Sequence, residues 1–413
     1  MKRVLMIAYH FPPLAGSSGI QRTLRFAEHL PEFGWSPIIL TVHPRAYEHT
    51  HAGLLAEIPP SVQVLHAPAW DASRHFSVAR RYPRFLALPD RWASWRWGGI
   101  ASGLLALRRY RPAAIWSTYP IATAHTIGST LSRLGGLPWM ADFRDPMAQD
   151  GYPTDPTQWQ HYLQIEQRTI AQAAASTFVA PGALAHYRQR YPSYAERMHL
   201  IENGYDDSLA HSGEHAPSLN PGQLTLLHSG IVYPSERDPS HFFEALAQLR
   251  MQAPELFGRL RIRFRGAIHD DLLHALARQH HLEESIQICP ITDYRNATRE
   301  MQAADGLLLM QASNCNQQIP AKFYEYLSTR RPILTLSDPT GDTNMSARAA
   351  GLTACAPLDD TPAIVKLLHR FASTPDEGTH AREASIEAAS RRARTATLAA
   401  LLNTLVAHGS ALE

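Results

Sequence analysis

Short apolar runs alternate with segments of helical periodicity along most of the chain. The runs are rich in valine, isoleucine and leucine, which is typical of strands that are buried on both faces of a parallel sheet. In the first half the predicted strands are Val4–Tyr9, Pro37–Val42, Val62–His66, Ala113–Thr118, Trp139–Phe143 and Thr177–Ala180. The second half restarts the pattern with Leu224–His228, Arg261–Arg265, Ile286–Cys289, Leu307–Met310 and Pro332–Leu336. We therefore predict an α/β protein with two doubly wound units in tandem.

A polar segment separates the two halves. It starts with the residues 202–206, Glu-Asn-Gly-Tyr-Asp, and continues through prolines and glycines to Gly222. This composition is typical of a turn followed by a linker. We place the boundary near residue 206, which gives a first unit of 1–205 and a second of 206–380.

The remaining segment, 381–413, is rich in alanine and arginine and is predicted to be helical from about His380 to His408. Its leucines recur mostly at spacings of three and four, so one side of the helix has an apolar stripe to bury. We expect this terminal helix to cross back from the second unit and to pack on the first.

The composition is that of a globular protein with more than one domain, since the chain has 413 residues, of which 45% are hydrophobic and 18% charged. No apolar run approaches the roughly 20 residues of a membrane-spanning helix. The first run ends at two prolines and is interpreted as a buried strand instead of a signal peptide. No zinc-type spacing connects the three cysteines, Cys289, Cys315 and Cys355. We predict a cytoplasmic protein without a structural metal.

Charge is distributed unevenly between the halves. Residues 1–205 contain 20 basic and 13 acidic side chains, whereas the remainder contains 19 basic and 24 acidic ones. The excess of positive charge suggests that the first half meets an anionic partner, such as a diphosphate-linked acceptor or the inner face of a membrane. An uneven but solvated surface is the alternative.

Basic and aromatic residues interleave in the tract from Arg74 to Trp97. The tract contains Arg74, Arg80, Arg81, Arg84, Arg91 and Arg96 together with Phe76, Tyr82, Phe85, Trp92, Trp95 and Trp97. Such a composition suits peripheral contact with an anionic membrane surface, and a loop packed on its own domain is the alternative. No recognised nucleic-acid-binding module surrounds the tract, so we expect no nucleic-acid partner.

A glycine-containing loop follows the first predicted strand. It runs from His10 through Gly16 to Gly19, and helical spacing begins at Ile20. Loops at the carboxyl ends of parallel strands line the ligand crevice, and a glycine-rich loop that opens a helix presents N–H groups to phosphate oxygens. The glycine spacing differs from that of nicotinamide-binding loops. We predict an anion-binding loop, with a simple tight turn as the alternative.

Charged residues also end a later strand of the first half, at Asp142, Arg144 and Asp145. Ionisable groups at such a position are costly unless they are paired or used, so a binding or catalytic role and a structural salt-bridge cluster both remain open. His10 and His125 are the candidate crevice histidines, either of which could act as a general base.

In the second half, Gly230 follows the first strand and Arg237 precedes the next helix. Glycine allows close approach of the backbone, and arginine binds a diphosphate through two parallel hydrogen bonds. Further on, Lys322 occupies the first turn of a predicted helix, where a cation is unfavourable unless an anion binds there. Glu325 follows three residues later and can accept hydrogen bonds from the two hydroxyls of a ribose. An exposed lysine–glutamate pair is the alternative.

Nearly the whole chain resembles the GT-B glycosyltransferases, in particular the retaining family 4. The matching features are the loop Gly16–Gly19, Asp142 to Pro146, Asn203-Gly204, Gly230 with Arg237, and Pro320 to Leu327 followed by Arg331 to Leu334. The resemblance implies two Rossmann-like domains that face a central cleft, with an acceptor bound by the first and a nucleotide diphosphate sugar by the second. It also implies that Glu325 holds the ribose, while Gln317 stands where the family has a glutamate near the sugar.

The resemblance further implies a retaining transfer to a glycan, a lipid-linked intermediate or a small-molecule glycoside. No Asp-x-Asp sequence is present to bind a metal, so we expect a metal-independent reaction without a cofactor, in which Arg237 and Lys322 face the departing diphosphate. Two other functions remain open. One is a nucleotide-sugar epimerase of the same double fold, and the other is a catalytically silent partner subunit, which the glutamine at Gln317 suggests.

Overall fold

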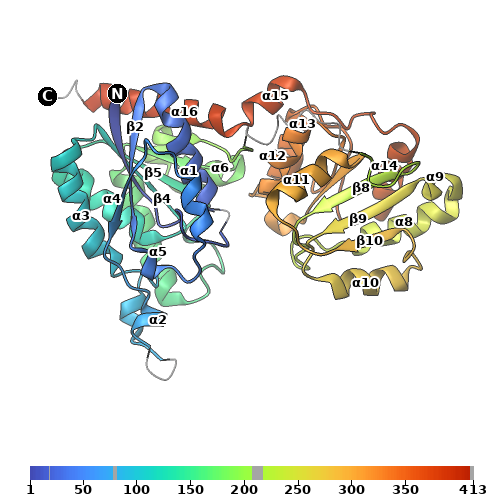
Figure 1. Ribbon diagram of the computed structural model, residues 1–413, viewed down its shortest axis with the longest axis horizontal. Helices are drawn as coiled ribbons and strands as arrows, with labels where there is room; N and C mark the ends of the chain where they lie inside the picture. Colours follow the sequence, from blue (N-terminus) through green and yellow to red (C-terminus); the bar gives the residue numbers. More distant parts are fainter. Residues whose placement is uncertain (18, 78–80, 207–216, 410–413) are drawn as a thin grey trace. The chain divides into compact units, whose positions relative to one another are not determined.

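The computed structural model describes residues 1–17, 19–77, 81–206 and 217–409. They form two compact units, drawn in Figure 1. Unit 1 contains Met1–Glu202 and the chain from Arg391 onward, and unit 2 contains Asn203–Ser390. Residues 207–216 of the predicted linker lie outside the described part of the chain.

Unit 1 is built on a parallel sheet. Its described strands are β1 (Lys2–Ile7), β2 (Trp35–Val42), β3 (Gln63–Ala67), β4 (Ala114–Thr118), β5 (Trp139–Arg144), β6 (Ala175–Phe178) and β7 (Met198–Leu200). They lie in the order β3-β2-β1-β4-β5-β6-β7, so β1 pairs with β2 on one side and with β4 on the other. This order defines a Rossmann-like doubly wound sheet, in which the direction of winding reverses between β1 and β4.

Unit 2 repeats the same winding. Its described strands are β8 (Leu224–Ser229), β9 (Leu260–Arg265), β10 (Ile286–Cys289), β11 (Gly306–Gln311), β12 (Ile333–Ser337) and β13 (Cys355–Ala356). They lie in the order β10-β9-β8-β11-β12-β13, with parallel pairing throughout, and the reversal falls between β8 and β11. The fold prediction of two tandem doubly wound units is confirmed. The short strands β7 and β13 were not predicted, because two or three residues show no periodicity.

Helices of the described residues connect the strands. Those of unit 1 are α1 (Gly19–His29), α2 (Ala72–His75), α3 (Trp95–Tyr110), α4 (Ala122–Gly135), α5 (Pro156–Gln172), α6 (Pro181–Arg190) and α16 (Arg391–Gly409). Those of unit 2 are α8 (Ser240–Gln252), α9 (Pro254–Gly258), α10 (Asp270–Gln279), α11 (Tyr294–Ala303), α12 (Ala321–Thr329), α13 (Asp342–Ala349), α14 (Thr361–Ser373) and α15 (Glu383–Ala388). Within the described ranges, no helix combines the length and the apolar character that crossing a membrane requires.

The helices of unit 1 cover both faces of its sheet because neighbouring residues of a strand point to opposite sides. In β4, the Trp116 ring packs edge-on against Phe26 of α1, at 5.9 Å between centroids. The next residue, Ser117, contacts His125 of α4 on the other face, at 2.8 Å between Oγ and Nδ1. Thus α1 lies on one face of the sheet and α4 on the other.

The C-terminal segment forms two helices in place of the single one that we predicted. Of these, α15 belongs to unit 2 and α16 to unit 1. The break coincides with Ser390, beside which the carbonyl of Ala389 accepts the N–H of Tyr205 at 3.1 Å. Within unit 1, α16 contributes Leu398 and Leu402 to the core that also contains Leu24 of α1.

Replacing Leu402 by alanine is expected to lower the free energy of unfolding of unit 1 by about 2–5 kcal/mol, because a fully buried leucine leaves a cavity. The matched control is Thr404→Ala on the exposed side of the same helix, with an expected change within about 0.5 kcal/mol. Denaturant titration monitored by hydrogen exchange in α1 measures both. Equal unfolding free energies for the two variants would contradict this packing of α16.

Candidate functional site

In unit 2, the reversal of strand order brings a glycine and a lysine together. β8 ends at Ser229, and Gly230 follows with a φ angle of +140°, a backbone conformation that favours glycine. A Cβ atom at Gly230 would lie 3.2 Å from Cε of Lys322, so a larger residue would crowd the lysine. The absence of a side chain at Gly230 therefore lets Lys322 extend across the end of β8.

Lys322 lies in the first turn of α12, whose N-cap is Pro320 and has no side-chain cap. The Nζ atom of Lys322 donates to Oε2 of Glu325 at 2.7 Å, and both side chains are partly exposed. A cation at a helix N-terminus opposes the helix dipole, and the nearby carboxylate offsets that cost. The two residues present a cation and a hydrogen-bond acceptor side by side, next to Gly230.

Tyr326 fixes α12 against the end of β8. Its buried hydroxyl accepts the backbone N–H of Ser229 at 2.9 Å, and burial raises the pKa of Tyr326. We did not predict a role for Tyr326 from the sequence. Its spacing of four from Lys322 was the available signal, because it places both side chains on one side of the helix.

Arg237 is held in the loop that follows β8. Its Nη1 donates to the carbonyl of Ile231 at 3.2 Å, and its guanidinium lies 5.3 Å from the centre of the Tyr233 ring. Burial lowers the pKa of His228 to about 4, and the charges of Arg237 and Lys322 act in the same direction. Both cations therefore lie within electrostatic reach of the end of β8.

Gln317 is exposed in the segment that leads into α12. The preceding residue, Asn316, is held by two hydrogen bonds. Its Nδ2 donates to Oδ2 of Asp338 at 2.9 Å, and its backbone carbonyl accepts the N–H of Asp342 at 2.8 Å. A Cβ at Gly341 would lie 2.6 Å from Oδ1 of Asn316. The segment after β12 thus supports the segment that carries Gln317.

In unit 1, the side chains of His10 and Arg144 lie next to the N-terminus of α1. A Cβ at Gly19 would lie 2.5 Å from Nδ1 of His10 and 2.8 Å from Nη1 of Arg144, so a larger residue there would displace both side chains. The N–H of Gly19 donates to Oγ of Ser17 at 3.2 Å, and Gly16 turns the preceding loop with a φ of +79°. Burial, together with the charge of Arg144, lowers the pKa of His10 to about 4.

Arg144 has an unusual backbone conformation. Its φ angle is +62°, and the pairing of β5 with β6 shifts register between Asp142 and Arg144. Such a conformation costs a non-glycine residue on the order of 1–3 kcal/mol, and strained residues of this kind cluster at functional sites. Among the described residues, its guanidinium has no hydrogen-bond partner. Burial raises the pKa of the adjacent Asp145, against the opposing charge of Arg144.

Asp142 is fully buried and fully paired. Its Oδ2 accepts Nε of Arg22 at 2.9 Å and its Oδ1 accepts Nη2 at 2.8 Å. The hydroxyls of Thr118 and Thr177 each donate to the same carboxylate at 2.8 Å. Burial would raise the pKa of Asp142, but the charge and hydrogen bonds of Arg22 hold it below its usual value. These contacts are those of a structural ion pair.

Solved structures of similar fold cover nearly the whole chain. Sucrose-phosphate synthase from Thermosynechococcus elongatus is 14% identical with a TM-score of 0.66, over 99% of this chain and 100% of that one. HepE from Anabaena in complex with UDP and glucose is 12% identical with a TM-score of 0.62, over 98% and 100%. WaaG, a glycosyltransferase involved in lipopolysaccharide biosynthesis, is 14% identical with a TM-score of 0.59, over 98% of each chain.

Of these neighbours, sucrose-phosphate synthase and WaaG are glycosyltransferases with two Rossmann-like domains. This chain has the GT-B fold. No protein-family model matches the sequence, and a search of curated proteins finds no match.

Within the GT-B fold, the residues predicted as binding or catalytic fall into two groups. Gly230, Lys322 and Glu325 come together in unit 2, where Arg237 lies near the same strand end. In unit 1, His10 and Arg144 meet at Gly19.

His125, which we predicted as a candidate general base, lies in the core of unit 1. It is completely buried, and its Nδ1 lies 2.8 Å from Oγ of Ser117. Its ring lies 5.1 Å from that of Phe143, and burial lowers the pKa of His125 to about 4. Trp139 and Phe143 of β5 thus pack against this histidine of α4, which has the surroundings of a structural residue.

A buried carboxylate that we did not predict fixes the loop after β5. Oε2 of Glu166, on α5, accepts the N–H of Ala148 at 3.0 Å and the hydroxyl of Tyr187 at 2.5 Å. Its Oε1 accepts the hydroxyl of Tyr191 at 2.6 Å and pairs with Arg190 at 3.2 Å. No local motif indicates this cluster, because three separate segments supply its members.

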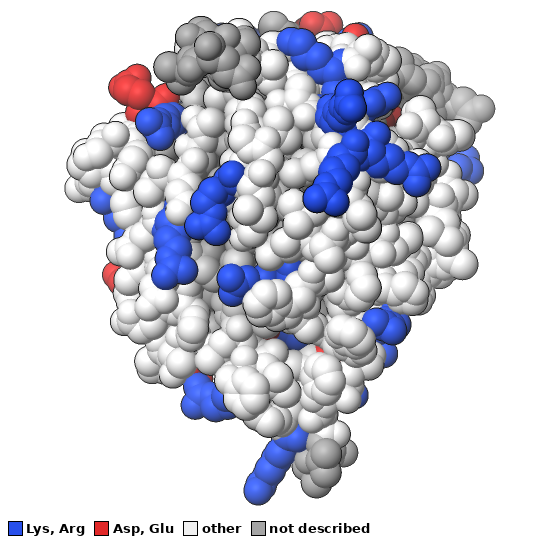
Figure 2. Space-filling view, turned by 90° about the vertical axis from the view of Figure 1, so that its left-hand side faces the viewer, with Lys and Arg blue, Asp and Glu red and all other residues white. Residues whose placement is uncertain are grey.

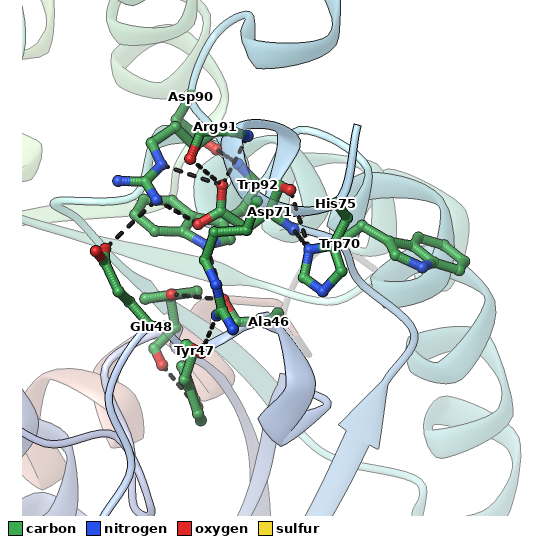
Figure 3. Close-up of polar contacts among 12 residues, drawn as sticks. Ala46, Tyr47, Glu48, Trp70, Asp71, His75, Asp90, Arg91 and Trp92 are labelled. Atoms are coloured by element: carbon green, nitrogen blue, oxygen red, sulfur yellow. Dashed lines mark hydrogen bonds and ion pairs between the residues drawn. The ribbon is translucent and has the colours of Figure 1, made fainter. Parts of the chain in front are cut away.

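Part of the Arg- and Trp-rich tract packs on unit 1, as Figure 3 shows for Arg91, Trp92 and their neighbours. The rest is largely at the surface, where Arg74, Phe76, Arg81, Arg84, Phe85 and Arg96 are exposed, and Arg80 lies outside the described residues. Nε of Arg91 donates to Oδ1 of the buried Asp71 at 3.1 Å. Nε1 of Trp92 donates to the carbonyl of Ala46 at 3.2 Å, and Trp95 is completely buried. By contrast, Trp97 is 72% exposed, so the three tryptophans do not form one surface.

No group of three or more His, Cys, Asp and Glu side chains suited to a metal ion occurs in the part of the chain that the structure describes.

Acidification is expected to destabilise the protein between about pH 6.5 and pH 4. In the unfolded chain His125 takes up a proton near the ordinary histidine pKa of about 6.5. In the folded protein, burial lowers its pKa to about 4. The contribution of neutral His125 to the free energy of unfolding is therefore complete above about pH 6.5 and is lost as the pH falls to about 4. His125→Gln should reduce the loss between these pH values by about 3 kcal/mol, measured by denaturant titration. His51→Gln, at an exposed histidine of unit 1, is the control. Identical pH profiles for wild type and His125→Gln would contradict this account.

Proposed function

We propose that the protein is a glycosyltransferase that moves a sugar from a nucleoside diphosphate sugar to a hydroxyl acceptor. The observation that carries this proposal is the cluster of Gly230, Lys322 and Glu325 where the strand order of unit 2 reverses. Ligands of open α/β sheets bind outside the carboxyl ends of the strands at such a reversal. A cation, a glycine without a side chain and a carboxylate there match the diphosphate and ribose of a nucleotide sugar.

The diphosphate would bind between Gly230 and the first turn of α12. Backbone N–H groups at a helix N-terminus favour an anion, and Lys322 adds a full positive charge beside them. Arg237 would supply a second cation from the loop after β8, because its guanidinium can donate two parallel hydrogen bonds. Bound phosphate would also remove the unfavourable interaction between Lys322 and the helix dipole.

Glu325 would accept hydrogen bonds from the two ribose hydroxyls. In the structure its Oε2 accepts Nζ of Lys322, and a carboxylate retains further acceptor positions after one such bond. Donor binding would therefore keep the carboxylate in place while the lysine turns towards the diphosphate.

The reaction that we propose is a retaining, metal-independent transfer with no cofactor. The bond between the anomeric carbon and the diphosphate oxygen breaks, and a bond from the acceptor oxygen to the same carbon forms. The departing diphosphate oxygen takes the proton of the acceptor hydroxyl, on the same face of the sugar. Arg237 and Lys322 would stabilise the charge that develops on the leaving group.

Unit 1 is the proposed acceptor domain, and the acceptor is a glycan, a lipid-linked intermediate or a small glycoside. His10 and Arg144 beside Gly19 would bind an acceptor that carries negative charge, since a guanidinium without a hydrogen-bond partner among the described residues lies at a helix N-terminus. HepE was solved in complexes with UDP and with UDP-glucose, which makes uridine diphosphate sugars the first donors to test.

Glu325→Ala is expected to raise the dissociation constant for UDP-glucose by about 100-fold or more, because two charge-assisted hydrogen bonds to the ribose are lost. Isothermal titration in the absence of metal measures the constant. The matched control is Glu383→Ala, which removes the ion pair of Glu383 with Arg330 at the opposite end of α12. A control variant with wild-type affinity and a Glu325 variant with weakened binding support the proposal. Equal affinities in both variants and the wild type, each with saturable binding, would overturn the role of Glu325.

Transfer activity is expected to persist in excess EDTA, because cationic side chains in place of a metal face the leaving diphosphate. Release of UDP from UDP-glucose is measured with a panel of hydroxyl acceptors, with and without chelator. Loss of activity that manganese restores would show that the reaction needs a metal. Conversion of the donor without any acceptor would instead identify an epimerase.

A further inference from the structure

The outward side of α3 carries apolar and basic residues. Trp97 and Leu105 are 72% and 66% exposed, and they follow a spacing of four that includes Ala101 and Arg109, which are also exposed. This spacing places all four on one side of the helix. A helix of a water-soluble unit ordinarily presents polar residues on its exposed side, so this stripe of tryptophan and leucine is unusual.

The opposite side of α3 packs closely on α4. A Cβ at Gly99 would lie 2.5 Å from Ile127, and the close approach of Gly103 to Leu131 repeats this contact one turn later. The two glycines let the helices approach each other, and both are buried. The inward side of α3 is thus filled by its own unit, whereas the stripe with Trp97 and Leu105 is left at the surface.

The two helices run in the same direction, because later residues of α3 contact later residues of α4. Near their C-terminal ends, Leu134 of α4 is 58% exposed and the adjacent Arg133 is exposed. On α3, Arg108 and Arg109 are exposed as well. Trp97, Leu105, Leu134, Arg108, Arg109 and Arg133 together define the α3–α4 face.

No acidic residue opposes this charge within either helix. The sequence between Asp90 and Asp142 contains no aspartate or glutamate but six arginines. Figure 2 shows the side of the molecule on which α3 lies, where lysine and arginine side chains stand across the surface and acidic ones are visible almost only at the margins. The exposed apolar side chains therefore lie in a positively charged surface.

We propose that the α3–α4 face docks on the surface of an anionic lipid bilayer. Tryptophan and leucine would enter the boundary between headgroups and acyl chains, while the arginines extend to the lipid phosphates. Negative headgroups complement the charge, and the exposed apolar side chains favour a lipid surface over a nucleic acid, whose phosphates would engage only the arginines. The face lies on the outward side of α3, so the main contact differs from the tract that the sequence indicated, with Trp97 common to both.

Docking does not rest on the proposed transferase activity, because it is measured without a nucleotide sugar. The full-length protein is sedimented with vesicles of phosphatidylcholine alone and of phosphatidylcholine with phosphatidylglycerol, at low and high salt. We expect binding to the anionic vesicles at low salt, weaker binding at high salt because salt screens the arginines, and little binding to the neutral vesicles.

Two sets of variants locate the contact. Arg108→Gln/Arg109→Gln/Arg133→Gln is expected to lower the partition coefficient by about 100-fold, and Leu105→Ser/Leu134→Ser by about 10-fold or more. All five side chains are exposed, so both variants should fold, which their circular dichroism verifies.

Matched controls come from exposed residues elsewhere. Arg278→Gln/Arg295→Gln/Arg299→Gln makes the same change of net charge in unit 2, and Phe85→Ser tests the 71% exposed aromatic residue of the tract. Both controls should retain vesicle binding within about threefold, since only a loss of position-specific contacts lowers affinity strongly.

Three outcomes would overturn the proposal. The first is a wild type that stays in the supernatant with anionic vesicles at low salt. The second is an arginine control that loses as much binding as the α3–α4 variant, which would indicate a general charge effect. The third is a wild-type dimer that Leu105→Ser/Leu134→Ser converts to a monomer with unchanged vesicle binding, which would make the face an interface between copies.

Discussion

The buried ion pair between Arg22 and Asp142 fixes the geometry of unit 1 at the edge where its ligands are expected. Arg22 comes from α1 and Asp142 from β5, and the same guanidinium donates to the carbonyls of Ile201 and Glu202 after β7. Removing one partner of a buried pair leaves an uncompensated charge, which costs about 3–5 kcal/mol. The pair thereby holds the start of α1, at Gly19, close to the last residue of β5.

The two units use charge differently although their sheets wind in the same way. In unit 1 the carboxylate at the sheet edge is enclosed by Arg22 and two threonines, so its charge serves the fold. In unit 2 a neutral bond between Tyr326 and Ser229 attaches the helix, and the charges of Lys322 and Glu325 stay partly exposed. Only the second arrangement leaves an ion pair that a ligand can replace.

Much of the fold could be predicted because sheet-forming patterns are local. Each of the eleven predicted strands overlaps a strand of the structure, since a run of buried β-branched residues carries its own signal. The partners of a charged group are not local. Arg22 and Asp142 lie 120 positions apart, and Glu166 takes its partners from two other segments, the loop after β5 and α6 with the residue that follows it. Neither cluster therefore has a sequence spacing that indicates it.

The sequence by itself determined two doubly wound units and placed Gly230, Lys322 and Glu325 near strand and helix ends, because backbone preference and apolar periodicity act over a few residues. Only the tertiary structure decided which side chains are accessible. Burial depends on which distant segments pack against a residue. His125 and Trp95 lie in the core whereas Trp97 is exposed, and nothing in the local sequences indicated this difference. The closeness of His10 and Arg144 likewise arises from pairing between distant strands, and the exposed stripe of α3 exists because glycines bring its other side against α4.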